Sequence, residues 1–397
     1  MIIMIYLDNA STTKIDPVVL EEMMPYLKEE YGNAGTPHPL GSRAHDAVAK
    51  ARRQVADMLN ASPGQIIFTS GGSEANNMAL KTCMYDGIYE NKHTMLVSEI
   101  EHSSVLNTAN FLHMKYGFEV HKLPVNSLGI VKLTDYLLLL DKYVDDIALV
   151  SVMMTNNEVG STNNIRALST ECQERGIKFH CDCVQAAGYH DIDVEALGCD
   201  FISLSAHKIH GPKGVGALYV KDRETLVPLI HGGANQEFGC RGGTENVAGI
   251  VGFGKACEIY THEAKAIREK IDGLKKRFVT ALTKAMSDRG MAENLHFNAG
   301  SEYSKGKVLS VRIDGIDAET MVLALGANGI CVSSGSACRS YEQEPSYVLQ
   351  AVGLSAEGAR DTIRVSLSKM NTESEVDEAV KRIADMALFL YNRYRTH

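Results

Sequence analysis

The sequence predicts an α/β protein built on a mostly parallel sheet, because short apolar strands alternate with amphipathic helices through the first half of the chain. Each predicted strand ends in a glycine-containing or polar turn. The predicted strands cover residues 65–70, 94–100, 146–154, 177–183, 200–206 and 215–220. Because ligands of such sheets bind at the carboxyl ends of the strands, the polar residues at those ends are the first candidates for a functional site.

The pattern changes after residue 258, where a long charged helix is predicted. Its apolar residues recur at three- and four-residue spacing, which suits a connector between domains. They are Ile267, Ile271, Leu274, Phe278 and Leu282. The predicted elements of this half are a helix at 259–290, a strand at 307–314, a helix at 317–328, a strand at 362–368 and a last helix that opens with the capping box TESE at 372–375. We expect a large domain over 14–258 and a smaller α+β domain formed by 1–13 and 259–397.

The composition also favours two domains, because 397 residues are too many for one ordinary core. The net charge is −9 and no run of basic residues is longer than the three at 275–277, so nucleic-acid binding is not predicted. No apolar run reaches the ~20 residues that a membrane helix needs. The N-terminus lacks a basic leader and a cleavage site, and the nine cysteines lack paired spacing. We therefore expect a cytoplasmic protein with reduced thiols.

Lys208 is the first candidate for chemistry. It lies in SLSAHKIHGPKG directly after a predicted strand, where its amine would point into the crevice at the sheet edge. Taken alone, an exposed lysine at a turn is the commoner interpretation. A lysine that forms a Schiff base with pyridoxal phosphate needs an anion site, a carboxylate for the ring nitrogen and a flat group against the ring.

Each of these supporting groups has a candidate, and each candidate has a plainer alternative. In FTSGGSEANN the glycine pair and Ser73 open a helix whose free N–H groups would face a phosphate, although a tight turn looks the same. Asp182 ends a strand at the same sheet edge as Lys208 and would meet the ring nitrogen, unless it caps a helix. Gln185 would meet the ring hydroxyl oxygen or solvent. His102 would stack on the ring or move a proton, although one histidine among 14 is usually structural.

Three further patterns bear on chemistry. Arg364 lies within an otherwise apolar strand and needs an anion, either a substrate carboxylate or an internal Asp or Glu. In HCDC, Cys181 and Cys183 share one face of the strand and His180 and Asp182 the other, so a zinc site is not predicted. The loop SSGSACRS at 333–340 places the thiol of Cys338 among small residues, as in a mobile catalytic loop, although an inert loop thiol is equally common.

These motifs together resemble the cysteine desulfurases, a group of class V aminotransferase relatives that bind pyridoxal phosphate. The resemblance runs nearly end to end. It rests on YLDNASTT, YGNAGTPH, FTSGGSEANN, EHSSVL, NNEVGS, HCDCVQAAG, SLSAHKIHGPKGVGALYV, RGGTEN, SSGSACRS with EPSYVLQAVG, and IRVSLS. It implies the aminotransferase-like fold of type I pyridoxal-phosphate enzymes, with the catalytic cysteine loop at about 330–345 in the smaller domain. The phosphate turn has Gly72-Ser73 where the family usually has Ala-Thr.

The resemblance also implies a role for each matching residue. Lys208 would be the Schiff-base lysine, Cys338 the sulfur acceptor, and His102 a catalytic residue stacked on the cofactor ring. The other cofactor-binding positions would be Gly72, Ser73, Asn157, Asp182, Gln185, Ser205 and His207, with Thr244 reaching the phosphate from the second subunit of a homodimer. Asn157 and Arg364 would bind the substrate carboxylate.

The implied reaction converts L-cysteine to L-alanine and leaves a persulfide on Cys338. Arg339 or a histidine of the site would favour the Cys338 thiolate. A scaffold protein for iron-sulfur clusters or a thiolation enzyme would then take the sulfur. Selenocysteine lyase and a transaminase-like activity are alternatives on the same fold, and a non-catalytic sulfur-assembly adaptor is a third, although the chain keeps both Lys208 and Cys338.

Overall fold

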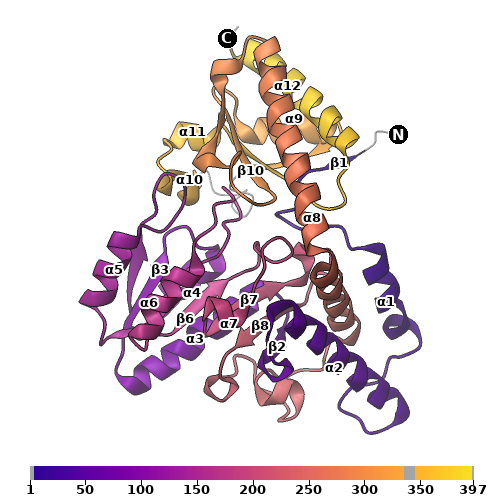
Figure 1. Cartoon of the computed structure of the whole chain (residues 1–397), viewed down its shortest axis with the longest axis vertical. Coiled ribbons are helices and arrows are strands. Elements are labelled where there is room, and N and C mark those ends of the chain that lie inside the picture. The colour runs from indigo at the N-terminus through magenta and orange to yellow at the C-terminus, as the bar shows by residue number, and fades with distance from the viewer. Residues whose placement is uncertain (1–3, 335–344, 396–397) are drawn as a thin grey trace.

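A seven-stranded sheet forms the core of the larger, lower part of the computed structural model in Figure 1, and the structure describes residues 4–334 and 345–395. Its strand order is β2-β8-β7-β6-β5-β3-β4. The strands are β2 (Ile66–Thr69), β3 (Thr94–Ser98), β4 (Glu119–Leu123), β5 (Ile147–Ser151), β6 (Phe179–Asp182), β7 (Phe201–Ser205) and β8 (Gly216–Val220). Neighbours from β7 to β4 are parallel, and only β8 runs antiparallel to both of its neighbours. The predicted α/β class with a mostly parallel sheet is confirmed.

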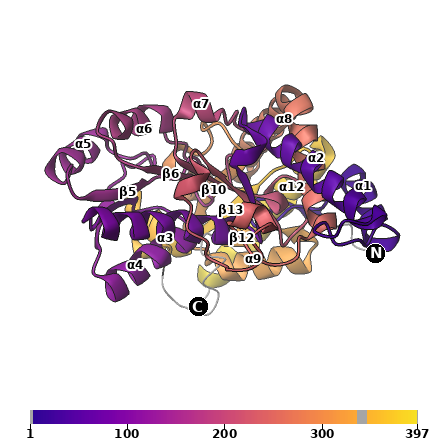
Figure 2. The same ribbon diagram turned by 90° about the horizontal axis from the view of Figure 1, so that it is seen from below.

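Helices cover both faces of this sheet, as Figure 2 shows. One face carries α3 (Gly72–Glu90) and α4 (Ser103–Tyr116), and the other carries α5 (Leu133–Lys142), α6 (Ile165–Glu174) and α7 (Val194–Leu197). Successive strand residues point to opposite faces, so Ile66 and Phe68 join the core beneath α5 and α6 while Ile67 joins the core beneath α3 and α4. Burial on both faces explains why most strands read as continuous apolar runs.

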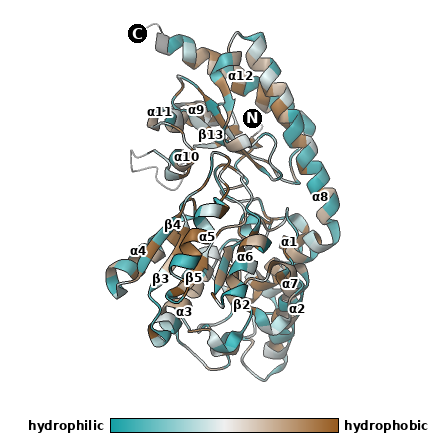
Figure 3. Ribbon diagram, turned by 60° about the vertical axis from the view of Figure 1, so that its left-hand side comes forward, coloured by the Kyte–Doolittle hydropathy of each residue, from teal (hydrophilic) through white to brown (hydrophobic). Residues whose placement is uncertain are grey.

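A second, four-stranded sheet lies at the other end of the molecule (Figure 3). Its order is β12-β13-β10-β9 and all neighbours are antiparallel. The strands are β9 (Leu295–Phe297), β10 (Val308–Ile313), β12 (Ser333–Ser334) and β13 (Thr362–Ser366), and α9 (Ala318–Ala327) and α12 (Glu373–Arg395) pack here. The chain's beginning joins this part, because β1 (Ile5–Tyr6) pairs in parallel with β11 (Ile330–Cys331).

The connecting helix α8 (Val247–Asp288) starts earlier than the predicted 259. Asn246 caps it by accepting a hydrogen bond from the Gly249 N–H. Its first turns are buried nearly all round, so they show no amphipathic period that the sequence could have revealed. Farther along, Ile271 belongs to the core of the large sheet and Leu274 to the core of the small one. One continuous helix thus ties the two sheets together.

The remaining helices are short or peripheral. They are α1 (Pro17–Lys28), α2 (Pro39–Leu59), α10 (Tyr347–Ala351) and α11 (Ala356–Arg360). The predicted capping box of the last helix is confirmed, because Thr372 and Glu375 exchange side-chain to backbone hydrogen bonds of 2.9 and 3.2 Å. Across the described ranges, no helix is long and apolar enough to cross a membrane. The eight cysteines in those ranges are free thiols.

Candidate active site

The candidate site lies where the parallel strands end. β6 ends with Asp182 and β7 ends with Ser205, and because the two strands are parallel their ends share one edge of the sheet. A single turn of 3₁₀ helix, Ala206–Lys208, follows β7 and carries His207 and Lys208. The sequence prediction that Asp182 and Lys208 lie at the same edge is confirmed.

The N-terminal segment forms a wall against this turn. The Nζ atom of Lys208 donates to the carbonyl oxygens of Ala10 and Ser11 at 2.6 and 2.7 Å. The His207 ring contacts the Thr12 hydroxyl at 3.1 Å. Nearly two hundred residues separate these partners along the chain. The sequence analysis gave residues 10–12 no role of their own, and the only available signal was a polar run directly after a short apolar strand.

Asp182 is buried and held from two sides. Its Oδ1 accepts from the backbone N–H of Val184 at 2.9 Å, and its Oδ2 accepts from Asn76 Nδ2 at 2.8 Å. The same amide nitrogen donates to the Ser104 hydroxyl at 2.9 Å, and the backbone N–H of Ser104 donates to His102 Nδ1 at 3.1 Å. A continuous hydrogen-bond network therefore joins Asp182 to His102. Sequence reasoning missed its two linking residues, Asn76 and Ser104.

His102 caps the start of α4 and is uncharged near neutrality. Burial lowers the pKa of its imidazole, the nearby Lys208 charge lowers it further, and Asp182 opposes both. Because Nδ1 accepts a hydrogen bond from the backbone, the neutral ring carries its proton on Nε2. Burial, followed by the positive charges of Lys208, Lys213 and Lys307, lowers the pKa of His207 to about 4.

Glu101, next to His102, is a fully buried carboxyl group. Its Oε1 accepts from the backbone N–H of Met153 at 2.5 Å, and its Oε2 has no hydrogen-bond partner among the residues that the structure describes. Burial and then the neighbouring charge of Asp182 raise the pKa of Glu101 well above its usual value. The raised pKa of Glu101 disfavours a second negative charge beside Asp182.

A Glu101→Gln variant is expected to gain stability over the parent as the pH rises. A carboxyl group whose folded-state pKa is raised binds its proton more tightly when folded, so the parent loses stability as the pH rises above the unfolded value of about 4.3. Glutamine keeps the acceptor for Met153 and cannot ionise. Thermal unfolding of both proteins from pH 4 to pH 8 measures the difference. A constant gap between the two melting temperatures would show that Glu101 does not titrate in this way.

Arg364 lies in the middle of β13 with its side chain buried. Its Nη2 donates to Asp8 Oδ1 at 2.9 Å and to Ser11 Oγ at 2.6 Å, and its Nη1 donates to the carbonyl oxygen of Asn157 at 3.0 Å. The internal ion pair offered as one interpretation of Arg364 is therefore present. Its Nε is buried and has no partner within the described ranges, so this donor is a candidate contact for a ligand. The structure brings Asn157 and Arg364 together.

The predicted phosphate turn opens α3 at the same edge. Gly71 has φ 153° and provides no side-chain cap for the helix, so the first N–H groups of α3 are left for a ligand. A Cβ atom on Gly72 would come within 2.6 Å of Val184 Cγ2, which accounts for glycine here. Ser73 and His102 both line a groove of about 480 Å³ between α3 and α4. Gln185 donates to the Ala10 carbonyl oxygen at 2.8 Å, and its buried Oε1 has no partner in the part of the chain that the structure describes.

The RGGTEN segment is fixed beside this turn. Arg241 donates to both carboxylate oxygens of Glu74 in the first turn of α3, at 3.0 and 3.3 Å. Burial opposes ionisation of Glu74, but the hydrogen bonds from Arg241 and Ser70 lower the net pKa of its carboxyl. Thr244 of the same segment is exposed. Its contact with a phosphate across a subunit interface stays a prediction.

The Cys338 loop falls outside the described residues, since 335–344 are not among them. The same holds for Arg339. The chain is described again just after this segment, where the Ser346 hydroxyl donates to Glu158 at 2.5 Å and the Tyr347 hydroxyl donates to the Glu101 carbonyl oxygen at 2.5 Å. These two bonds attach the start of α10 to the loops that carry His102 and Asn157.

The HCDC strand has the alternation that the sequence predicts. The sulfur atoms of Cys181 and Cys183 lie 3.4 Å apart on one face. On the other face, the His180 ring lies between the hydroxyls of Ser151 and Ser203, at 2.8 and 3.0 Å. Burial lowers the pKa of His180 to about 4, so this histidine is a neutral part of the core.

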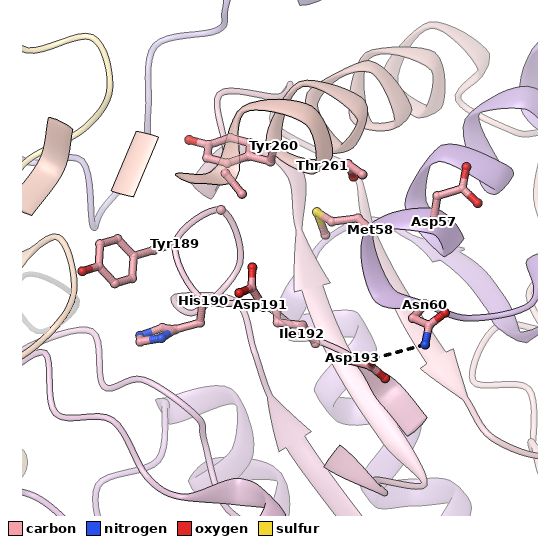
Figure 4. Close-up of a pocket in the computed structure, with 12 residues that line it drawn as sticks. Asp57, Met58, Asn60, Tyr189, His190, Asp191, Ile192, Asp193, Tyr260 and Thr261 are labelled. Carbon is pink, nitrogen blue, oxygen red and sulfur yellow. Dashed lines mark hydrogen bonds between the residues drawn. The ribbon is translucent and has the colours of Figure 1, made fainter. Parts of the chain in front are cut away.

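A second cavity, of about 180 Å³, shares none of these residues (Figure 4). It lies between the end of α2, the loop at 188–193 and α8. Two of its acidic lining residues have side-chain partners: Arg268 donates to Asp191 at 2.5 Å, and Asn60 donates to Asp193 at 3.2 Å. This cavity is therefore separate from the strand-end site.

Known proteins share both the sequence and the fold of this chain. Residues 5–379 match the family model described as Aminotransferase class-V. The cysteine desulfurase IscS of Clostridium botulinum is 41% identical over 375 residues, which cover 94% of this chain and 91% of that protein. This chain belongs to the cysteine desulfurase family. The resemblance seen in its motifs is confirmed.

Solved structures of related proteins agree with this membership. A NifS-like protein superimposes with a TM-score of 0.88 at 38% identity, over 98% of this chain and all of that one. A second match is titled SspA in complex with cysteine, with a TM-score of 0.77 at 33% identity, over 92% of this chain and 99% of that one. This cysteine desulfurase family member therefore has the aminotransferase-like fold of type I pyridoxal-phosphate enzymes that its motifs predicted.

Proposed function

We propose that this protein is a pyridoxal-phosphate-dependent cysteine desulfurase that converts L-cysteine to L-alanine and transfers the sulfur to Cys338. The observation that carries the proposal is the convergence of Lys208, Asp182 and His102 at one sheet edge, with the anion-binding turn of α3 beside them. Family membership supports the same activity.

The residues present fit pyridoxal phosphate. The turn at Gly72 and Ser73, with Ser205 and His207, would hold the phosphate, and the uncapped N-terminus of α3 favours an anion there. Asp182 would meet the ring nitrogen, and the unpartnered Oε1 of Gln185 would meet the ring hydroxyl. When bound, the cofactor supplies an electron sink for the pair released at the substrate Cα.

Lys208 would hold the cofactor covalently and then move the substrate proton. Its amine donates to the carbonyl oxygens of Ala10 and Ser11 in the N-terminal segment, and both are neutral acceptors. Freed by the incoming substrate, it would take the proton from Cα as a general base. His102, uncharged and fixed through Nδ1, would lie against the ring with its Nε2 proton available.

Cys338 would carry the sulfur. Its thiolate forms a bond to the substrate sulfur while the carbon–sulfur bond breaks, and the carbon keeps the bonding electron pair and takes up a proton. The products are a persulfide on Cys338 and alanine. The assignment rests on the SSGSAC motif. The anchored start of α10 after this segment supports it.

Arg364→Gln is expected to raise KM for L-cysteine about tenfold to a hundredfold, because a charged hydrogen bond to the substrate carboxylate contributes roughly 1.5–3 kcal/mol. The variant also leaves Asp8 without its partner. Asp8→Asn is therefore the matched control, since it breaks the same ion pair and keeps the arginine. Steady-state kinetics of both variants separate the two effects. Equal rises in KM for Arg364→Gln and Asp8→Asn would show that Arg364 acts through its ion pair with Asp8 and not by binding the substrate.

A substrate panel tests the proposed function. The cofactor-loaded protein is given L-cysteine, L-selenocysteine, or an amino acid with a keto acid, and alanine and amino-group transfer are measured. Alanine from L-cysteine supports desulfuration. Alanine from L-selenocysteine alone would establish the lyase, and amino-group transfer without alanine from either would establish a transaminase.

The proposed reaction also needs partners. We propose a homodimer in which Thr244 of one subunit reaches the phosphate in the other, and the exposure of Thr244 in the single chain is compatible with this. The persulfide sulfur would pass to an iron-sulfur scaffold or a thiolation enzyme. A cytoplasmic location would suit this reaction, because a reducing compartment keeps the acceptor thiol of Cys338 out of disulfides.

A further inference from the structure

Lys307 is a buried lysine that the proposed reaction does not use. It stands directly before β10, in the part of the chain that forms the small sheet, with only 7% of its surface exposed. Its Nζ crosses to the large sheet and donates to the carbonyl oxygen of Lys208 at 3.2 Å. The backbone of Lys307 is fixed as well, because its carbonyl oxygen accepts from the N–H of Leu367 at 2.9 Å. A long flexible amine is therefore held on the main chain of the lysine that would bind the cofactor.

The charge that acts on Lys307 is the positive charge of Lys208. Among the described residues, no carboxylate forms an ion pair with it. Burial, followed by the charge of Lys208, lowers the pKa of Lys307 to about 7. Its own charge contributes to the lowered pKa values of three neighbouring histidines, which are His190, His207 and His210.

Other charged side chains also shift the pKa values of these three histidines. Positive charges lower these pKa values: Lys213 lowers that of His207, Lys305 and Arg268 lower that of His190, and Lys369 lowers that of His210. Carboxylates raise histidine pKa values: Asp191 raises that of His190 and Asp16 raises that of His210. Asp182 raises the pKa of His102, which Lys208 lowers. Each of these carboxylates acts on a histidine, and none is a cause of the shift at Lys307.

We propose that Lys307 is a positioning residue that holds the backbone of Lys208 and, through its charge, weakens proton binding at the Lys208 nitrogen. Two amines in a shared low-dielectric site repel each other when both are charged, and a cationic neighbour is a known way to keep a lysine nucleophilic. A less basic Lys208 has a larger neutral fraction at neutral pH, which suits both attachment of the cofactor and removal of the Cα proton. The inference rests on the proposed role of Lys208.

The test is a spectrophotometric pH titration of the cofactor-loaded full-length protein. The visible absorption of the bound cofactor reports when the Lys208 nitrogen loses its proton, and it requires no turnover. Because burial lowers the pKa of Lys307 to about 7, its charge acts on Lys208 mainly below that pH, and in Lys307→Met and Lys307→Gln the midpoint is expected to move to higher pH by at most about one unit, a tenfold effect. Glutamine keeps a donor for the Lys208 carbonyl oxygen and removes the charge. The midpoint of the glutamine variant therefore tests the proposal even if the methionine variant fails to fold.

Lys307→Arg is the matched control because it keeps the positive charge. Its midpoint is expected at or below that of the parent, since arginine stays charged at every pH of the titration. Unmoved midpoints in the methionine and glutamine variants would overturn the proposal. An equal upward shift in all three variants would also overturn it, because packing and not charge would then be the cause.

Borohydride reduction and peptide mapping of the parent separate this proposal from the proposed function. Cofactor fixed at Lys208 with unmoved midpoints removes only the role of Lys307. Cofactor fixed at a different lysine overturns both.

Discussion

Lys208→Ala is expected to lose the covalently attached cofactor and to lower kcat for alanine formation at least about a thousandfold. The side chain would both bind the cofactor and move the Cα proton, and a positioned acid–base group alone is worth roughly 10²- to 10⁴-fold. Alanine leaves the carbonyl oxygens of Ala10 and Ser11 without their donor. The rest of the site stays in place. Mass spectrometry after borohydride reduction and a kinetic assay measure the two effects.

Lys213→Ala is the matched control for this variant. Lys213 lies in the same HKIHGPKG segment but is exposed. It should keep both the attached cofactor and the parent kcat. If Lys208→Ala retained cofactor that borohydride fixes to the chain, Lys208 would not be the attachment site.

Cys338→Ser is expected to bind cofactor and substrate normally and to form no persulfide. A serine hydroxyl has nearly the shape of the thiol but is not ionised near neutrality, so it cannot attack the substrate sulfur. Alanine formation in the presence of a thiol reductant should fall by a factor on the order of a thousand. A spectral change on adding L-cysteine shows that the substrate still reaches the cofactor.

Cys331→Ser controls for the mere loss of a thiol near this segment. Cys331 is a half-buried free thiol in β11, and burial raises its pKa, which disfavours the reactive thiolate. This variant should keep full activity. Persulfide formation in the Cys338→Ser protein would place the acceptor at another residue.

Much of the fold was predictable because its strands alternate with helices and end in polar turns. The parallel order of β6 and β7 follows from that alternation, and it alone brings Asp182 and Lys208 to one edge. The edge strand β4 was missed because Glu119, His121 and Lys122 interrupt its apolar pattern, as is usual for an exposed edge. The start of α8 was missed because its first turns are apolar on every side.

The parts of the site that were not predictable come from distant segments of the chain. The wall at Ala10 and Ser11 contacts Lys208 although nearly two hundred residues separate them along the chain, and the pairing of β1 with β11 holds the strand that precedes this wall. Asn76 lies within α3, and nothing in the local sequence distinguishes it from other polar helix residues; only the folded structure shows its contact with Asp182. Lys307 contacts Lys208 across the two sheets, and no local pattern encodes such a pairing.

The most direct test of desulfuration at Cys338 is a single-turnover experiment without reductant. The cofactor-loaded protein is mixed with a slight excess of L-cysteine and quenched, and alanine and sulfur bound to the Cys338 peptide are both quantified. The proposed reaction predicts one alanine and one persulfide sulfur on Cys338 for each active site. Alanine formed without sulfur on Cys338, or sulfur found on a different cysteine, would contradict it.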